Sequence, residues 1–194
     1  MQRSIKYILL LFPLVLLSSS KVYDDFKNKY ENIESIFIEF IDEDTNEEGS
    51  IKAKKGNKYR INYFKRILIC DGETIWNYSP FEKQVIISSL DSFSSDFSLD
   101  AFFFTSMKNY KEISTSSTLS SSNGKMIKVK LEDVKTRNKI ELHFNQNEQL
   151  KKLNYTDDYV SQSWILKNIN TNIELDDKFF HFSPPDSIEV IDLR

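Results

Sequence analysis

The feature that most constrains the fold is an alternation of apolar and polar residues that turn residues interrupt. It is clearest around Asp71-Gly72, which follows the apolar run 67–69 and precedes Trp76 and Tyr78. Aspartate and glycine tolerate the positive φ of tight hairpin turns, so this dipeptide predicts a hairpin. Trp76 and Tyr78 are two residues apart and therefore lie on one face of the second strand. A large apolar face in a β protein must be covered by a core, a lid or a ligand.

The alternation recurs on both sides of this hairpin and predicts further antiparallel strands, each with one apolar and one solvated face. These segments are 51–53, 59–63, 127–131 and 140–144. Segment 36–41 has apolar residues at both its even-numbered and its odd-numbered positions, which predicts a strand that is apolar on both faces. The serine- and threonine-rich stretch 114–122 is predicted to be a loop. Segment 179–182 is predicted to be a last strand, which the prolines at 184–185 end.

Two segments break the β pattern and predict helices. Apolar residues from Val22 to Ile33 recur at helical spacing with charged residues between them, which indicates an amphipathic first helix. Between Ser88 and Tyr110 phenylalanine is dense, and residues 95–98 include candidate N-caps, so we expect one or two short helices. The fold class predicted is mainly β: a long, curved antiparallel sheet whose concave side these helices cover.

The first twenty residues have the pattern of a cleaved secretory signal. Arg3 and Lys6 form a positive start, 7–17 is apolar apart from Pro13, and 18–20 supplies small residues for a signal peptidase. The apolar run is short for a membrane span, which needs about 20 residues. We therefore expect residues 1–20 to be removed and residues 21–194 to form a single soluble domain.

Composition narrows the class of partner and the redox chemistry. Without Arg3 and Lys6 the mature chain has 24 basic against 29 acidic residues, a net charge near −5. A mildly acidic chain argues against nucleic acid as the partner. Cys70 is the only cysteine, so no internal disulfide forms, and its apolar strand indicates a buried thiol.

The residues that carry catalytic or metal chemistry form no recognisable site. His143 and His181 are the only histidines, and neither has another ligand at metal-binding spacing. The carboxylates at 42–48 cluster around an expected hairpin loop, where a solvated charge run is the simpler interpretation. No serine lies in a nucleophile turn with a paired base. We predict neither an enzyme nor a metal or other cofactor.

Aromatic residues are more informative. The chain has 15 Phe, 9 Tyr and 2 Trp. This number is larger than the number of aromatic residues that a flat sheet covered by two helices needs. Core packing is the simpler role for each of them singly. Together with the Phe-rich insertion, they also fit an apolar cavity that takes an apolar ligand.

At this point the chain resembles a known family, LolA, the periplasmic carriers of outer-membrane lipoproteins. Residues 71–80 read Asp-Gly-x-Thr-x-Trp-x-Tyr-x-Pro, and Gln84-Val85 follow. The match continues in order over nearly all of the mature chain. Its other parts are the leading helix, Phe40, Gly49, the basic turn before Tyr59-Arg60, the closing Phe180-x-Phe182-x-Pro184-Pro185 and 190–192.

The resemblance implies a fold and a function. Its members are similar to an unclosed β-barrel, a half-barrel of about eleven antiparallel strands, with short helices as a lid over an apolar cavity. In that scheme the protein binds the acyl chains of lipoproteins released from an inner-membrane ABC complex of the LolCDE type. It then delivers them to an outer-membrane receptor of the LolB type. We expect a monomer in the periplasm of a Gram-negative bacterium.

The resemblance and the aromatic pattern together suggest which residues line the acyl-chain cavity. On the lid side these are Phe93, Phe97, Leu99, Phe102 and Phe103. On the sheet side they are Phe40, Tyr59, Tyr63 and Trp76.

The chain departs from the family at the lid latch. Where the family has an arginine followed by proline that holds the lid shut, this chain has Lys55 followed by Gly56. Lysine offers a single ammonium rather than a planar fork, so it would bind fewer acceptors. Either the lid is held more loosely or Arg60 or Lys54 replaces the arginine. An exposed lysine in a hairpin turn is an equally good interpretation. Ile61 stands where the family commonly has tryptophan.

Of three other functions, the sequence rules out the outer-membrane receptor and counts against the other two. An outer-membrane receptor of the same fold needs a lipidated cysteine at its mature N-terminus, where this chain has Lys21. A periplasmic sensor of lipids or lipoproteins could use the same half-barrel, although such proteins usually have an extra domain. An enzyme of lipid metabolism lacks a nucleophile and a base here.

Overall fold

The computed structural model describes residues 20–92, 99–120 and 124–194. Its strands are β1 (Ser35–Asp42), β2 (Glu47–Lys54), β3 (Lys58–Tyr63), β4 (Arg66–Asp71), β5 (Thr74–Ser79), β6 (Gln84–Ser89), β7 (Tyr110–Ser120), β8 (Gly124–Asp133), β9 (Lys139–Phe144), β10 (Leu150–Thr156), β11 (Ser161–Thr171) and β12 (Glu189–Asp192). Its helical elements are α1 (Lys21–Tyr30), η1 (Leu90–Ser92), α2 (Leu99–Ala101), the π-helical η2 (Phe102–Ser106), η3 (Met107–Asn109) and η4 (Asp177–Phe180).

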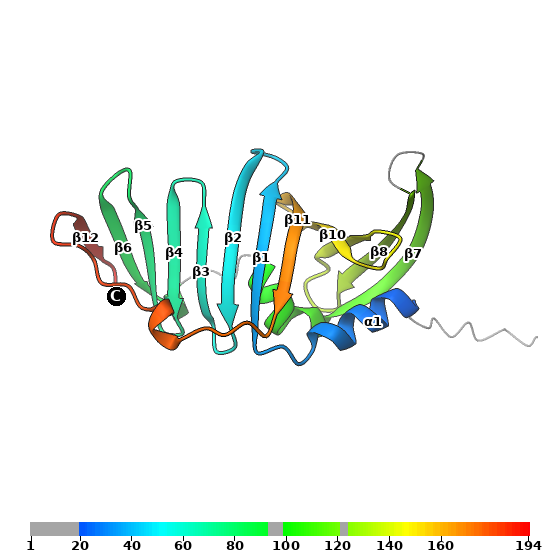
Figure 1. Ribbon diagram of the computed structural model, residues 1–194, viewed down its shortest axis with the longest axis horizontal. Helices are drawn as coiled ribbons and strands as arrows, with labels where there is room; N and C mark the ends of the chain where they lie inside the picture. The colour runs from blue at the N-terminus through cyan, green and yellow to red at the C-terminus, as the bar shows by residue number, and fades with distance from the viewer. Residues whose placement is uncertain (1–19, 93–98, 121–123) are drawn as a thin grey trace, which may run out of the picture.

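All twelve strands belong to one sheet (Figure 1). Their order is β12-β6-β5-β4-β3-β2-β1-β11-β10-β9-β8-β7, and every pair is antiparallel except β12 with β6. The sheet does not close, since β12 and β7 are separate edges. The expected mainly β, unclosed half-barrel with short helices is confirmed, with one strand more than the expected eleven.

Strand register gives the sheet two distinct faces. Ile38 of β1 is opposite Ile51 of β2, which is opposite Ile61 of β3, and residues opposite each other point to the same side. We call this side the inner face, because α1 and segment 99–109 pack against it. In β1 the inner-facing residues are almost fully buried, whereas Phe37 and Ile41 on the other, outer face are half-buried. This confirms that β1 is apolar on both faces.

Helix α1 covers one part of the inner face. Ser20 caps it, its side chain accepting a hydrogen bond from the Tyr23 amide. Phe26 and Tyr30 are buried together with Tyr23, at the spacing that puts them on one side of a helix. The Phe26 ring meets that of Phe144 from β9 edge to face, with centroids 5.4 Å apart. The expected amphipathic helix is confirmed.

Segment 99–109 packs beside α1 and is helical, as expected. Phe102 is fully buried, and the Phe103 ring centroid lies 5.0 Å from that of Tyr30. The candidate N-caps at 95–98 lie outside the described residues. Together α1 and this segment form the main core with β1, β2 and β7 to β11.

The C-terminal segment crosses the outer face at one end of the strands (Figure 1). Ion pairs of Asp177 with Lys54 and Lys58 hold η4 there, at 2.8 and 2.7 Å. The prediction of a strand at 179–182 was wrong. The Asp176 side chain accepts from the Lys178 amide, which caps a 3-10 turn instead, and the turn buries Phe180 completely.

The prediction of a loop at 114–122 was also wrong for residues 114–120, while 121–122 lie outside the described residues. Residues 110–120 form β7, which pairs with β8 from Tyr110 opposite Asp133 to Ser120 opposite Gly124. β7 lies at the edge of the sheet, and its residues 113–119 are exposed to solvent. Its side chains therefore need no alternation of apolar and polar residues. This strand makes a longer sheet than the sequence pattern indicates.

Gly49 is where β2 passes beneath the ring of Phe40. A Cβ at Gly49 would lie 2.2 Å from Cζ of that ring. We therefore expect Gly49→Ala to lower the free energy of unfolding by about 1–3 kcal/mol, because the buried ring must move. Urea unfolding of Gly49→Ala in wild-type and Phe40→Leu backgrounds tests this. Equal losses in both backgrounds would contradict a steric cause.

Candidate functional site

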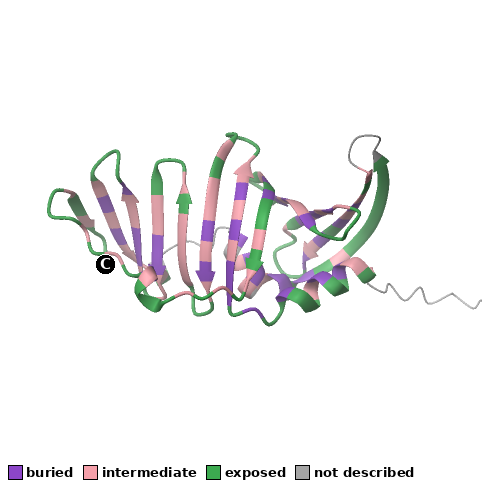
Figure 2. Cartoon of the chain, in the orientation of Figure 1, coloured by how far each residue is buried: buried purple, intermediate pink, exposed green. Residues whose placement is uncertain are grey.

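Beyond the main core, the inner face continues across β3 to β6 and is only partly covered. Five of its apolar side chains there are half-buried, whereas Cys70 and Ile75 on the same side are almost fully buried. Figure 2 shows β3 almost wholly in the colour of intermediate burial. We call this surface the inner-face patch, made of Tyr59, Ile61, Tyr63, Leu68 and Ile86. Register places all five on the same side as Ile51. The patch is continuous with the main core, against which its three β3 residues pack.

Phe40 and Tyr63 mark the end of the patch toward the hairpin tips. Their ring centroids are 5.8 Å apart. The Tyr63 hydroxyl donates to an Asp42 carboxylate oxygen at 2.9 Å, and it lies 2.9 Å from the Thr45 hydroxyl. Burial raises the pKa of Tyr63, so the phenol stays neutral at physiological pH. These bonds fix the ring at the rim of the patch.

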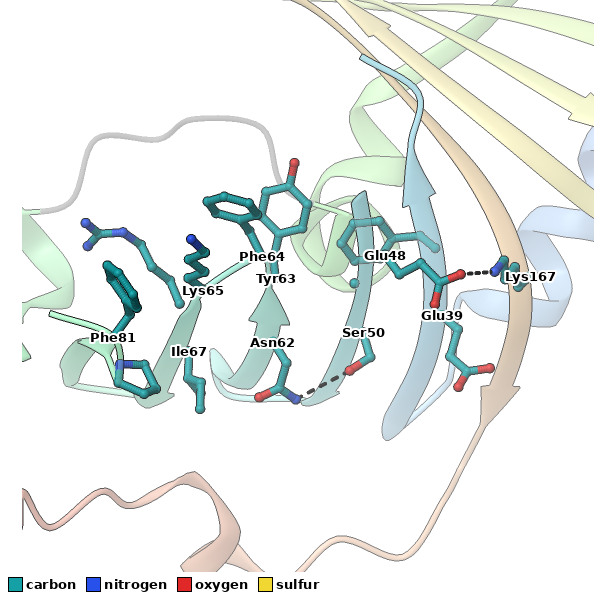
Figure 3. A pocket seen from close by; sticks show the side chains of 14 residues that line it. Glu39, Glu48, Ser50, Asn62, Tyr63, Phe64, Lys65, Ile67, Phe81 and Lys167 are labelled. Carbon is teal, nitrogen blue, oxygen red and sulfur yellow. Dashed lines mark hydrogen bonds and ion pairs between the residues drawn. The ribbon is translucent and has the colours of Figure 1, made fainter. Parts of the chain in front are cut away.

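A groove of about 700 Å³ opens beside this rim (Figure 3). Its walls combine residues from both faces, because it follows the end of the sheet where the hairpins turn. The apolar lining is Phe40, Tyr63, Phe64, Ile67, Pro80 and Phe81, and the charged lining is Glu39, Glu48, Lys65, Arg66 and Lys167. The volume is in the range of sites that take a large organic ligand.

Six of the nine cavity residues expected from sequence lie on or against the inner face. Phe40, Tyr59 and Tyr63 belong to the sheet side, and Leu99, Phe102 and Phe103 pack in the adjoining core. The lid-side residues Phe93 and Phe97 lie outside the described residues. Whether these side chains contact acyl chains stays a prediction.

Trp76 is the exception and corrects the expected set. It is opposite Ile69, whereas Tyr59 is opposite Cys70, and neighbouring residues of β4 point to opposite faces. Trp76 therefore lies on the outer face, where its ring centroid is 5.4 Å from that of His181. It shares a second core with Ile69, Val85 and Ile87.

The candidate latch residues make contacts with other parts of the chain. The Lys55 ammonium bonds the Glu34 carboxylate at 2.6 Å, in the connection from α1 to β1. Arg60 stacks on Phe179, 5.4 Å from its centroid, and Lys54 binds Asp177. Lys54 and Arg60 thus hold the C-terminal segment on the outer face. A latch role stays a prediction for Lys55 alone.

Sequence reasoning missed Leu68 and Ile86 of the patch and the exposed rings Phe64 and Phe81. Leu68 and Ile86 lie in runs in which successive residues are all apolar. The pattern therefore did not show which residues of each run face inward. The two exposed phenylalanines lie in hairpin turns, outside any alternation. Only the pairing of β3 to β6 shows where all four lie.

The described residues were not found to contain a metal site or a membrane-spanning helix. Within residues 20–92, 99–120 and 124–194 no cluster of three or more His, Cys, Asp or Glu could hold a metal ion. No helix in these ranges is long and apolar enough to cross a membrane. Cys70 is buried, as expected.

Comparison with known proteins adds a family to this geometry. Residues 31–183 match the family described as outer membrane lipoprotein carrier protein LolA. The chain belongs to the LolA family. The matched range covers every element from β1 through η4, so it includes the patch, the groove and segment 99–109. A search of the curated proteins found no match to this LolA-family chain.

One solved structure supports the fold of this LolA-family protein, and a second is similar more weakly. An uncharacterized conserved protein from Thermus thermophilus is similar with a TM-score of 0.53 at 13% identity, over 88% of this chain and 96% of that one. LprF from Mycobacterium bovis is similar over 87% of this chain and 96% of its own, at 8% identity and a TM-score of 0.42. At such identities the first likeness shows the fold alone.

The ion pairs of η4 give a pH prediction. Hydrogen bonds from Lys54 and Lys58 lower the pKa of Asp177 from 3.8 to about 2. Because the folded-state pKa is below the ordinary value, the stabilisation is complete above pH 3.8 and is lost as pH falls through about 2. In a Trp164→Phe background, we expect Trp76 fluorescence to shift to the red over this range as the segment loosens.

Asp177→Asn is the matching variant. It should show the loosened spectrum already at neutral pH and lose this transition, while Asp186→Asn, a change in the same segment, should keep it. The effect should be small and local, since both partners of each ion pair are accessible to solvent. A transition of wild-type size in Asp177→Asn would refute the assignment.

Proposed function

We propose that this protein carries lipoproteins between the two membranes of a Gram-negative cell, binding their acyl chains on the inner face of the sheet. The family match over residues 31–183 is the observation that carries the proposal. The inner-face patch supports it, because a half-covered apolar surface joined to a helical cover suits an apolar ligand.

The physical need for such a surface is large. Burial of a CH₂ group is worth about 0.8 kcal/mol, so one long acyl chain in water costs on the order of 10 kcal/mol. A carrier must therefore enclose the chains in apolar surroundings and still let them go. We assign the sheet side of the enclosure to Phe40, Tyr59, Ile61, Tyr63 and Leu68.

Segment 99–109 is the part best suited to move. It consists of helical pieces of three, five and three residues. Helices this short have little stability of their own and depend on packing. Displacing the segment would uncover Phe102 and Phe103, which then add apolar area to the patch. Leu99, Phe102 and Phe103 are thus the lid side of the site, and Lys55 is the candidate latch.

The finer parts of the proposal combine the family match with the sequence pattern of residues 1–20. Residues 1–20 serve as the secretory signal, and residues 21–194 function as one domain in the periplasm. The cargo comes from an inner-membrane ABC complex and passes to an outer-membrane receptor. A carrier or chaperone role, rather than catalysis, is what membership of this family supports.

Neighbouring residues of β3 provide a sharp test of the site. Ile61 points to the inner face, and Asn62 points to the outer face, where its amide bonds the Ser50 hydroxyl at 3.4 Å. We expect Ile61→Glu to weaken binding of a triacylated lipopeptide by about tenfold or more, because the carboxylate would have to be desolvated beside acyl chains. Asn62→Glu should bind as wild type does. Fluorescence titration with a labelled lipopeptide measures both affinities.

Thermal melts of both variants separate lost binding from lost folding. Equal affinities of folded Ile61→Glu and wild type would refute the proposed site. Mass spectrometry of what copurifies from the periplasm tests the function itself. Intact triacylated lipoproteins support a carrier, whereas free lipid alone would indicate a lipid-binding or sensing protein.

A further inference from the structure

Two neighbouring hairpins end in exposed phenylalanines. Phe64 is 62% exposed in the β3–β4 turn, and Phe81 is 75% exposed between β5 and β6. β4 and β5 are adjacent, so both turns lie at the same end of the sheet (Figure 1). Exposed rings that gather at one place indicate an interaction surface, whereas single exposed apolar residues are ordinary.

The conformation of Phe64 is costly for its residue type. Tyr63 is opposite Arg66, so Phe64 and Lys65 form a two-residue turn, and Phe64 has a φ of +54°. Glycine or asparagine is the usual residue at such a position, and a bulky side chain is strained there. The ring gains little burial in exchange, since most of it is exposed. Strain without a packing gain points to a function for this ring.

Basic residues accompany the two rings. The Lys65 ammonium lies 5.4 Å from the Phe64 centroid and 4.6 Å from the Phe81 centroid, and Figure 3 shows it between them. Arg66 binds Glu82 at 3.0 Å, and Lys83 follows in the second turn. These turns therefore have three basic residues against one acidic residue, on a chain whose net charge is −3.

Acidic residues limit the basic surface on one side. The β1–β2 turn, next along the same end of the sheet, contains Glu43 and Asp44, and Glu47 and Glu48 begin β2 directly after it. An anionic partner would therefore be attracted to the turns of β3 to β6 and repelled from the turn of β1 and β2. The contact would thus be made by one corner of the sheet end rather than by the whole of it.

We propose that Phe64, Lys65, Phe81 and Lys83 form a membrane-contact site, which binds the surface of a bilayer that contains anionic phospholipids. We call these four residues the membrane-contact tips. Aromatic rings enter the boundary between headgroups and acyl chains, while ammonium groups bind lipid phosphates. The groove of about 700 Å³ reaches these tips through Phe64, Lys65 and Phe81, so the site would place it against the bilayer.

This inference goes beyond carriage of acyl chains in solution and does not depend on it. A protein at the membrane could expose the groove to lipid directly, with less water between. The two proposals can fail separately, because the contact tips and the inner-face patch share no residue.

Vesicle flotation tests the proposal with the full chain. We expect the protein to bind vesicles of phosphatidylcholine with phosphatidylglycerol, and to bind about tenfold more weakly to phosphatidylcholine alone. Phe64→Ser with Phe81→Ser should weaken binding to the anionic vesicles by about tenfold or more. The thermal midpoint of the same variant should not fall, because both rings are mostly exposed in the folded protein.

Two further variants control for surface exposure and for folding. Tyr159 is 94% exposed in the β10–β11 turn beside Asp157 and Asp158, so Tyr159→Ser should leave vesicle binding unchanged. Phe64→Gly should weaken vesicle binding without lowering the thermal midpoint, because glycine accepts the positive φ.

The proposal is overturned by any of three results. These are equal binding to neutral and anionic vesicles, wild-type binding by Phe64→Ser with Phe81→Ser, and the same loss in Tyr159→Ser. The tips would instead be a protein-docking site if two results came together. The wild-type protein would bind none of the vesicles, and the tip variants would fail to exchange lipopeptide with a second protein.

Discussion

The structure depends on covering both faces of one long sheet with a few short segments. The inner face receives α1 and segment 99–109, and the outer face receives the C-terminal segment from η4 onward. In the part of the chain that the structure describes, neither cover spans all twelve strands, and much of the inner face of β3 to β6 is only half-buried. The incomplete cover is what makes an otherwise ordinary β protein suitable for an apolar ligand.

The packing of the main core sets conditions on how such a ligand enters. Four ring contacts among Phe26, Tyr30, Phe102 and Phe103 have centroid distances of 4.8 to 6.2 Å, as in a well-packed interior. Acyl chains would therefore bind first at the inner-face patch, where the side chains are less closely packed. They would extend under segment 99–109 only when that segment moves. Burial also raises the pKa of Tyr30 to about 12, so this contact stays uncharged and apolar at physiological pH.

Sequence predicted well wherever a residue's environment follows from its neighbours in the chain. The Asp71-Gly72 turn is an example: the Asp71 carboxylate accepts from the Glu73 and Thr74 amides, and Gly72 has a φ of +105°. The amphipathic α1 is another. Both depend on interactions within a few residues, which a pattern records directly.

Prediction failed where strand pairing decides. Trp76 and Tyr59 both belong to apolar alternations, but only the pairing of β4 with its two neighbours shows that they face opposite ways. β7 is a strand because β8 offers it a partner, although its serines and threonines favour a loop. Residues 177–180 form a 3-10 turn, in place of a strand at 179–182, because Asp176 caps it and two lysines hold Asp177. For Trp76 and β7 the deciding contact is a strand pairing. For the C-terminal turn it is a local cap together with ion pairs to distant lysines, which outweigh the apolar pattern.

An open sheet leaves two boundary strands whose backbone groups could recruit further copies of the chain into fibres. Here one boundary, β12, has only four residues, with Glu189 and Asp192 at its ends. The other, β7, is long, but most of its side chains have hydroxyl groups or charges, and Ile113 and Leu119 are its exposed apolar residues. The half-barrel can thus stay unclosed, as its interior requires, with less of the aggregation that long, apolar edge strands promote.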